Sequence, residues 1–297
     1  MPITTEFEYV KPKDMDEALH VFSLYKDKAR ALAGGTDLIV HLKENLARPE
    51  VVVDIKALEE LAGFTLKGEV LHIGALVTFS DLIDSPLIKS RCPLLWEAAL
   101  TVASVGVRNR ATVAGNICSA VPSADSAPVL AVYDAEVLTR SLRGERRLPI
   151  GEWFTGPKRT ALAPDEIVTA VELKLPAKKH AGCYMKLSRY DGEDLAQGGI
   201  AALAFADNTY RVAACALGPK PARCPKTEAV LNGNKLGEKV LARAKATILQ
   251  EVSPISDIRS SKEYRLHMTQ VMLGRALEKA VARLFGKGPK YGSENIA

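Results

Sequence analysis

The residue types that commonly hold metals are scarce and poorly spaced in this sequence of 297 residues. The cysteines, at positions 92, 118, 183, 215 and 224, include no C-x2-C pair, and the five histidines include no H-x3-H pair. Iron–sulfur clusters and structural zinc sites use such spacings. We therefore expect no metal in this chain, and reduced cysteine thiols in or near its core.

Long hydrophobic runs and concentrated charge are also lacking. No segment approaches the roughly 18 consecutive apolar residues of a membrane span, and the first residues do not resemble a secretory signal. We therefore expect no membrane span and a cytoplasmic location. The net charge is only +5, and the densest basic patch, residues 140–147, is interpreted as a solvated hairpin turning at Gly144. Nucleic acid is not an expected partner, because no aromatic residues are interleaved with these arginines.

What is present is the composition of a soluble globular protein, with 47% hydrophobic and 25% charged residues. A predicted strand, glycine turn, helix and second strand within the first part of the chain indicate a small α/β unit. Later strands pair through short turns and are followed by long helices, so the fold class is α/β (α+β). We expect two α/β subdomains, a C-terminal domain and a loose tail, at residues 1–54, 55–176, 177–285 and 286–297.

The first candidate site is the loop at residues 32–38, which follows a strand predicted at 29–33 and leads into a helix predicted at 37–42. Its two glycines let backbone N–H groups converge on an anion without obstruction by Cβ atoms. Thr36 adds a hydroxyl, and Asp37 is expected to accept N–H bonds at the helix start. The loop is neither the dinucleotide fingerprint nor a P-loop, so a tight turn that binds nothing remains the alternative.

The second candidate site is the longer loop at residues 108–125. Small residues permit a close approach of the backbone, and hydroxyl, amide and carboxyl side chains offer partners for a ligand that bears hydroxyl groups. A long cofactor with a diphosphate and a polyol chain needs such a lining. The alternative is a buried loop that satisfies its own polar groups.

Both loops carry a resemblance to a known family. The segments at residues 31–37, 53–55 and 107–117 resemble the FAD-binding medium subunit of the molybdenum hydroxylases, which include xanthine, carbon monoxide and nicotinate dehydrogenases. Residues 164–168 and 258–265 are similar to later motifs of that family, so the resemblance extends in order from residue 8 to about residue 285. It implies a two-part PCMH-type FAD-binding α/β domain, plus a C-terminal antiparallel sheet packed with helices.

The resemblance also implies the cofactor contacts. The two loops would wrap the diphosphate of FAD, Asp125 would bond the ribityl or adjacent hydroxyls, and Ala103 would lie against the cofactor. Lys186 would lie close to the flavin, where its charge would favour the reduced anion. The cofactor-binding assignments are Leu32, Ala33, Gly34, Gly35, Thr36, Asp37, Leu38, Ala103, Thr112, Val113, Ala114, Gly115, Asn116, Ser119, Asp125, Ile167, Val168 and Lys186. Ile167 and Val168, which would cover the ring system or adenine, are otherwise interpreted as strand core.

The implied function is electron relay by an oxidoreductase subunit. A large molybdopterin subunit would oxidise the substrate, a small subunit would carry [2Fe–2S] clusters, and non-covalent FAD here would pass electrons to NAD or another acceptor. The assembly would be a dimer of heterotrimers, with no catalytic acid or base in this chain. Many relatives have arginine where this chain has Tyr190, so the residue bordering the reactive face of the flavin is left open. The alternatives are a free-standing oxidase of the vanillyl-alcohol oxidase class and a nucleotide-binding scaffold without redox activity.

Overall fold

The computed structural model describes residues 2–190 and 193–293. The chain begins with a parallel sheet of order β1-β3-β2, in which β3 pairs with both neighbours. Helix α1 packs its apolar face on this sheet and is capped by Asp14, which accepts the N–H of Glu17 at 2.9 Å. The elements are β1 (Glu8–Val10), α1 (Met15–Tyr25), β2 (Ala29–Leu32), α2 (Leu38–Lys43) and β3 (Val51–Asp54), with a 3₁₀ turn η1 (Lys26–Lys28).

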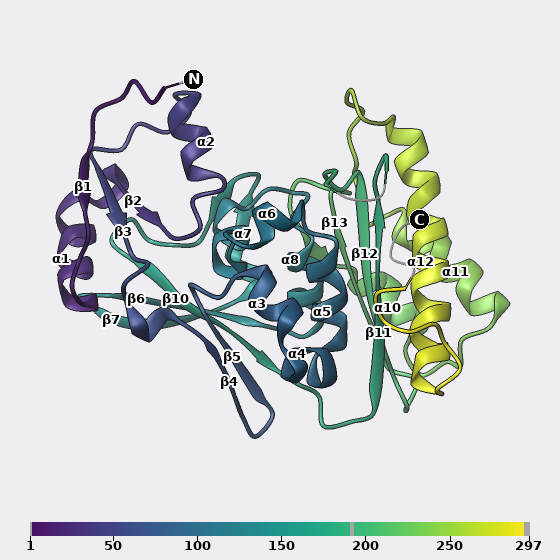
Figure 1. The fold of residues 1–297 in the computed structure, drawn as a ribbon. Coiled ribbons are helices and arrows are strands. Elements are labelled where there is room, and N and C mark those ends of the chain that lie inside the picture. The colour runs from purple at the N-terminus through teal and green to yellow at the C-terminus, as the bar shows by residue number, and fades with distance from the viewer. Residues whose placement is uncertain (1, 191–192, 294–297) are drawn as a thin grey trace.

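The second part is an antiparallel sheet of order β4-β5-β10-β6-β7, with short helices between β5 and β6. Figure 1 shows these helices between this sheet and the C-terminal strands. The strands are β4 (Phe64–Lys67), β5 (Val70–Gly74), β6 (Glu136–Ser141), β7 (Gly144–Pro149) and β10 (Ile167–Lys174), and the hairpin β8 (Phe154–Gly156) and β9 (Arg159–Thr160) stands apart. The helices are η2 (Glu59–Leu61), α3 (Phe79–Asp84), α4 (Pro86–Arg91), α5 (Pro93–Leu100), α6 (Val105–Arg108), α7 (Val113–Ser119), α8 (Ser126–Val132) and α9 (Ile150–Trp153).

The third part is an antiparallel sheet of order β11-β12-β13-β14 that is covered on both faces. Alternate residues of β11 face opposite sides: Met185 joins the core under α12, whereas Tyr184 joins the core shared with the earlier helices. This double burial explains why the strands are almost continuously apolar. The elements are β11 (His180–Leu187), β12 (Gly198–Phe205), β13 (Tyr210–Cys215), β14 (Ala222–Arg223), α10 (Pro225–Leu231), α11 (Glu238–Ile248) and α12 (Lys262–Leu284).

The hairpin expected at residues 140–147 is present as β6 and β7, and its arginines pair with carboxylates. Arg143 contacts Asp165 at 2.8 Å, and Arg147 contacts Glu172 at 2.7 Å. Among the described residues, no helix is both long and apolar enough to cross a membrane.

Two expectations about local structure were wrong. The second candidate loop is interrupted by helix α7, because Thr112 accepts the N–H of Gly115 at 2.9 Å and so caps a helix start that we interpreted as loop. The tail is not loose as far as residue 293. The Tyr291 hydroxyl accepts the N–H of Gly182 at 2.9 Å, and the N–H of Gly292 donates to Glu97 at 3.1 Å, so this segment packs on β11 and α5.

Candidate functional site

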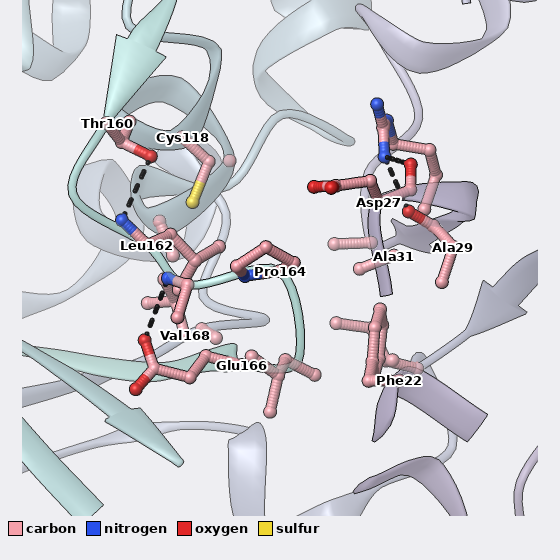
Figure 2. Close-up of a pocket in the computed structure, with 18 of the residues that line it drawn as sticks. Phe22, Asp27, Ala29, Ala31, Cys118, Thr160, Leu162, Pro164, Glu166 and Val168 are labelled. Carbon is pink, nitrogen blue, oxygen red and sulfur yellow. Dashed lines mark hydrogen bonds between the residues drawn. The ribbon is translucent and has the colours of Figure 1, made fainter. Parts of the chain in front are cut away.

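A cavity of about 650 Å³ opens between the N-terminal unit and the second sheet. Figure 2 shows its two walls, with Phe22, Ala29 and Ala31 on one side and Leu162, Pro164 and Val168 on the other. Its remaining lining residues are Lys26, Asp27, Arg30, Ala33, Ile55, Ala75, Thr112, Ala114, Gly115, Cys118, Thr155, Lys158, Arg159, Thr160, Ala163, Glu166 and Ile167. Its size and its mixture of polar and apolar lining residues suit a nucleotide-sized ligand.

The two candidate loops touch one another beside this cavity. A Cβ atom on Gly34 would lie 1.9 Å from the carbonyl oxygen of Arg110, so only glycine allows the backbones to approach this closely. Gly35 follows with a φ of +76°, a conformation that favours glycine. The hydroxyl of Ser119, at the end of α7, donates to the carboxylate of Asp37. Residues that are some 80 positions apart in sequence therefore form one structure.

The expected role of Asp37 was wrong. Its side chain accepts no N–H bond at the start of α2, because its φ of −96° and ψ of −45° are helical rather than the extended conformation of a capping residue. Its carboxylate instead accepts the Ser119 hydroxyl and joins the two loops.

The polar side chains of the second segment are already engaged with protein groups. Thr112 caps α7, and Asn116 accepts a hydrogen bond from the Ser126 hydroxyl at 2.7 Å. The N–H of Val113 donates to Val77 at 3.1 Å. These contacts fix the position of the segment, and they leave fewer of its groups for a ligand than the sequence suggested.

Only some of the assigned residues line the cavity. Those that do are Ala33, Thr112, Ala114, Gly115, Ile167 and Val168. Leu32, Gly34, Gly35, Thr36, Asp37 and Leu38 belong to or flank the first loop, and Val113, Asn116 and Ser119 belong to α7, all outside the lining. Ala103, Asp125 and Lys186 lie in a separate group between the second part and the C-terminal sheet.

The centre of that separate group is a buried ion pair. Lys186 Nζ lies 3.0 Å from Asp125 Oδ2 and donates to the carbonyl of Thr101 at 2.7 Å, while the Tyr184 hydroxyl donates to Asp125 Oδ1 at 2.6 Å. Burial raises the pKa of Asp125, and the Lys186 charge and the Tyr184 hydrogen bond offset part of that rise. Both oxygens of Asp125 are thus held by β11.

The segment next to this pair is held in an unusual conformation. Ala103 has a φ of 39°, in the left-handed region that non-glycine residues seldom adopt. The guanidinium of Arg108 donates to the carbonyls of Val102 at 2.8 Å and Ala103 at 2.6 Å. Lys186 therefore holds the carbonyl of Thr101, and Arg108 holds the carbonyls of the next two residues.

The cavity also has charged groups that the sequence did not point to. Lys26 and Arg30 contribute from one wall, and Lys158 and Arg159 from the other. The carboxylate of Glu166 is balanced by Arg146, whose two nitrogens both lie 2.6 Å from it. Cationic side chains beside apolar ones fit a ligand that combines phosphates with an aromatic base. The residues present therefore fit a dinucleotide such as FAD.

The cysteines match expectation except at one position. Cys92, Cys183, Cys215 and Cys224 are buried, whereas Cys118 is exposed and lines the cavity. Burial raises the pKa of the Cys92, Cys183 and Cys215 thiols to about 12, and desolvation raises the pKa of Cys118 to about 12 as well, so the Cys118 thiol is accessible but not activated. Within the described residues, no three His, Cys, Asp or Glu side chains are grouped to hold a metal ion.

Comparisons with known proteins identify the family. Residues 5–177 match the family described as the FAD binding domain in molybdopterin dehydrogenase, and residues 183–280 match the CO dehydrogenase flavoprotein C-terminal domain. The chain is 37% identical to the xanthine dehydrogenase FAD-binding subunit of Escherichia coli O157:H7, over 88% of this chain and 91% of that protein. It is 30% identical to the carbon monoxide dehydrogenase medium chain of Hydrogenophaga pseudoflava, over 95% and 99% of the two chains.

A solved structure of carbon monoxide dehydrogenase from the same organism superposes with a TM-score of 0.91, at 31% identity and with 95% of this chain and 99% of that chain covered. The expected fold class is confirmed by this similarity. The chain therefore belongs to the FAD-binding medium subunits of the xanthine dehydrogenase and carbon monoxide dehydrogenase family, which are oxidoreductase components.

Proposed function

We propose that this chain binds FAD without a covalent bond and relays electrons within a molybdenum hydroxylase complex. The observation that carries this proposal is the cavity beside the two joined glycine loops, which is lined by both apolar and cationic side chains. The first loop and the start of α7 would contact the diphosphate, and Ile167 and Val168 would cover the adenine or the ring system. When bound, FAD supplies a group that accepts single electrons and can release a hydride.

The residues of the chain would position the cofactor rather than transfer protons to a substrate. The Gly34 approach to Arg110 sets the spacing of the two loops, and Arg108 and Lys186 fix the backbone at Ala103, where the cofactor would rest. Asp125, whose oxygens are held by Tyr184 and Lys186, would present its remaining acceptor capacity to the ribityl hydroxyls. No histidine lines the cavity among the described residues, and Cys118 does. Covalent attachment is therefore tested directly by releasing the flavin from denatured protein.

The proposed partners are those that the family supports. A large subunit with molybdopterin would oxidise the organic substrate, a small subunit with [2Fe–2S] clusters would deliver electrons, and NAD or another carrier would accept them at this chain. We place the complex in the cytoplasm, where free thiols such as those of this chain persist. The assembly would be a dimer of heterotrimers.

The test is purification of the native complex with a tag on this chain, followed by metal and flavin analysis. Co-purifying molybdenum, iron and FAD in fixed proportion would support the relay. FAD in equimolar amount without molybdenum or iron, together with substrate oxidation by this chain alone, would instead show a free-standing oxidase. A colourless protein that binds no flavin would leave only a scaffold role.

A further inference from the structure

A second cavity, of about 420 Å³, lies at the C-terminal end of β11 beside the start of α12. Its lining residues are Leu187, Ser188, Arg189, Gln197, Arg259, Ser260, Ser261 and Tyr264. None of them lines the first cavity, and none is a carboxylate. Two guanidinium groups and three serine hydroxyls therefore meet without an acidic residue among them.

Gln197 is the residue that points to a ligand. It is only 4% exposed, lines this cavity, and has its backbone N–H bonded to the carbonyl of Leu187 at 2.8 Å. Within the part of the chain that the structure describes, its side-chain amide makes no hydrogen bond. The polar groups of buried side chains nearly always have a hydrogen-bond partner, either in the protein or in a molecule bound beside them. A polar ligand in the cavity would supply the missing partner.

The charges around the cavity favour an anion. Arg189 is exposed and donates to the carbonyl of Ile258 at 2.6 Å, and it forms no ion pair among the described residues. Arg259 pairs with Asp257 at 2.8 Å, but Arg265 shares the same carboxylate at 2.6 Å. Arg189, Arg259 and Arg265 thus outnumber the two carboxylates bonded to this group, which are Asp257 and Asp194, the acceptor of the Arg189 backbone N–H at 2.7 Å.

The start of α12 adds to this preference. This helix has 23 residues, and Ser261 caps it by accepting the N–H of Tyr264 at 3.2 Å. The N–H of Lys262 is also bonded, to the Ser256 hydroxyl at 2.8 Å, so it is the dipole of the helix that would stabilise a nearby anion. The helix start, the arginines and the unpaired amide all border the same space.

We propose that this second cavity binds the phosphate group of a small molecule. Phosphate oxygens accept from arginine, from serine hydroxyls and from the Gln197 amide at once, which is the set of donors the cavity offers. The proposal goes beyond the proposed function, because none of the residues proposed to contact FAD lines this second cavity. The phosphate would belong either to a nucleotide or to the free anion.

The test uses the full chain saturated with FAD, so that the first cavity is filled. Inorganic phosphate and ADP are titrated separately by isothermal calorimetry at low ionic strength, into the wild type and into Arg189→Gln and Gln197→Leu. Arg91→Gln, which removes an exposed arginine of α4, is the matched control. FAD content and unfolding midpoint are measured for every variant, so that a folding defect or a failure of FAD binding is recognised separately.

The proposal predicts saturable binding that weakens about tenfold or more in both cavity variants and is unchanged in Arg91→Gln. ADP binding much more tightly than phosphate would identify a nucleotide as the source, and equal affinities would identify the free anion. No saturable binding of either probe, or binding that Arg189→Gln and Gln197→Leu leave unchanged, would overturn the proposal.

Discussion

Lys186 Nζ lies 3.0 Å from Asp125 Oδ2, and this buried ion pair joins the C-terminal sheet to the preceding helices. The side chain of Lys186 is 2% exposed, so its removal leaves an uncompensated buried carboxylate. We expect Lys186→Met to lower the free energy of unfolding by about 3–5 kcal/mol. Chemical denaturation measures the difference.

The matched control for that prediction is Lys28→Met, because Lys28 pairs with Glu50 at 2.6 Å with both side chains more than half exposed. Exposed pairs contribute about 0–1 kcal/mol. Equal losses in the two variants would show that the buried pair has no special role. Replacing Asp125 by Asn in the Lys186→Met background should recover part of the loss, since it removes the unpaired charge.

Gly34 sets the distance between the two glycine loops. A Cβ atom there would lie 1.9 Å from the Arg110 carbonyl oxygen, so Gly34→Ala must push the loops apart. We expect FAD affinity to fall at least about tenfold, measured by quenching of flavin fluorescence. Gly106→Ala is the control, because its new methyl group meets open space. If Gly34→Ala binds FAD with unchanged affinity, the contact between the loops is not needed for cofactor binding.

Cys118 reports on occupancy of the first cavity. It lines the cavity and is exposed, whereas the other cysteines are buried. We expect iodoacetamide to modify Cys118 first in FAD-free protein, and saturating FAD to slow that reaction strongly, because the cofactor covers the thiol. Mass spectrometry of peptides after timed quenching measures both rates. Modification of Cys118 at the same rate with and without FAD would place the cofactor elsewhere.

Glu166, which lines the first cavity, makes the stability of the chain depend on pH. Burial alone would raise the pKa of Glu166, but the hydrogen bonds from Arg146 and from the Ala163 N–H hold that pKa below its ordinary value. The pair therefore adds stability above the unfolded pKa of about 4.3, and this stability is lost as the pH falls through the lower, folded pKa.

The variant Glu166→Gln tests this response. It should be less stable than the wild type at neutral pH, and its stability should fall less steeply below about pH 5. Thermal unfolding midpoints, recorded in steps from neutral to acidic pH, provide the comparison. If the unfolding midpoints of the two proteins change with pH in parallel, the pKa of Glu166 is not lowered in the folded state.

The sequence predicted the regular parts of the fold well. The strand at residues 29–33 and the helix at 37–42 were predicted from local patterns and are present as β2 and α2, and the hairpin at 140–147 is present as β6 and β7. Helix α7 was missed because its small and polar residues also suit a loop. Only the capping bond from Gly115 to Thr112 decides between them.

The site could be predicted only where its residues form local motifs. The glycine loops were found in this way, but Lys26, Arg30, Lys158 and Arg159 resemble ordinary surface charges, and only the folded chain brings them to one cavity. The hydrogen bond from Tyr184 to Asp125 likewise joins residues 59 positions apart. No pattern of spacing signals a contact of that kind.

The most direct test of non-covalent FAD binding is the amount and release of flavin in the purified chain reconstituted with FAD. After removal of free cofactor, we expect equimolar FAD, all of it released into the supernatant when the protein is denatured with acid. Protein that retains no FAD, or flavin that stays with the precipitated chain, would contradict the claim that this subunit holds FAD without a covalent bond.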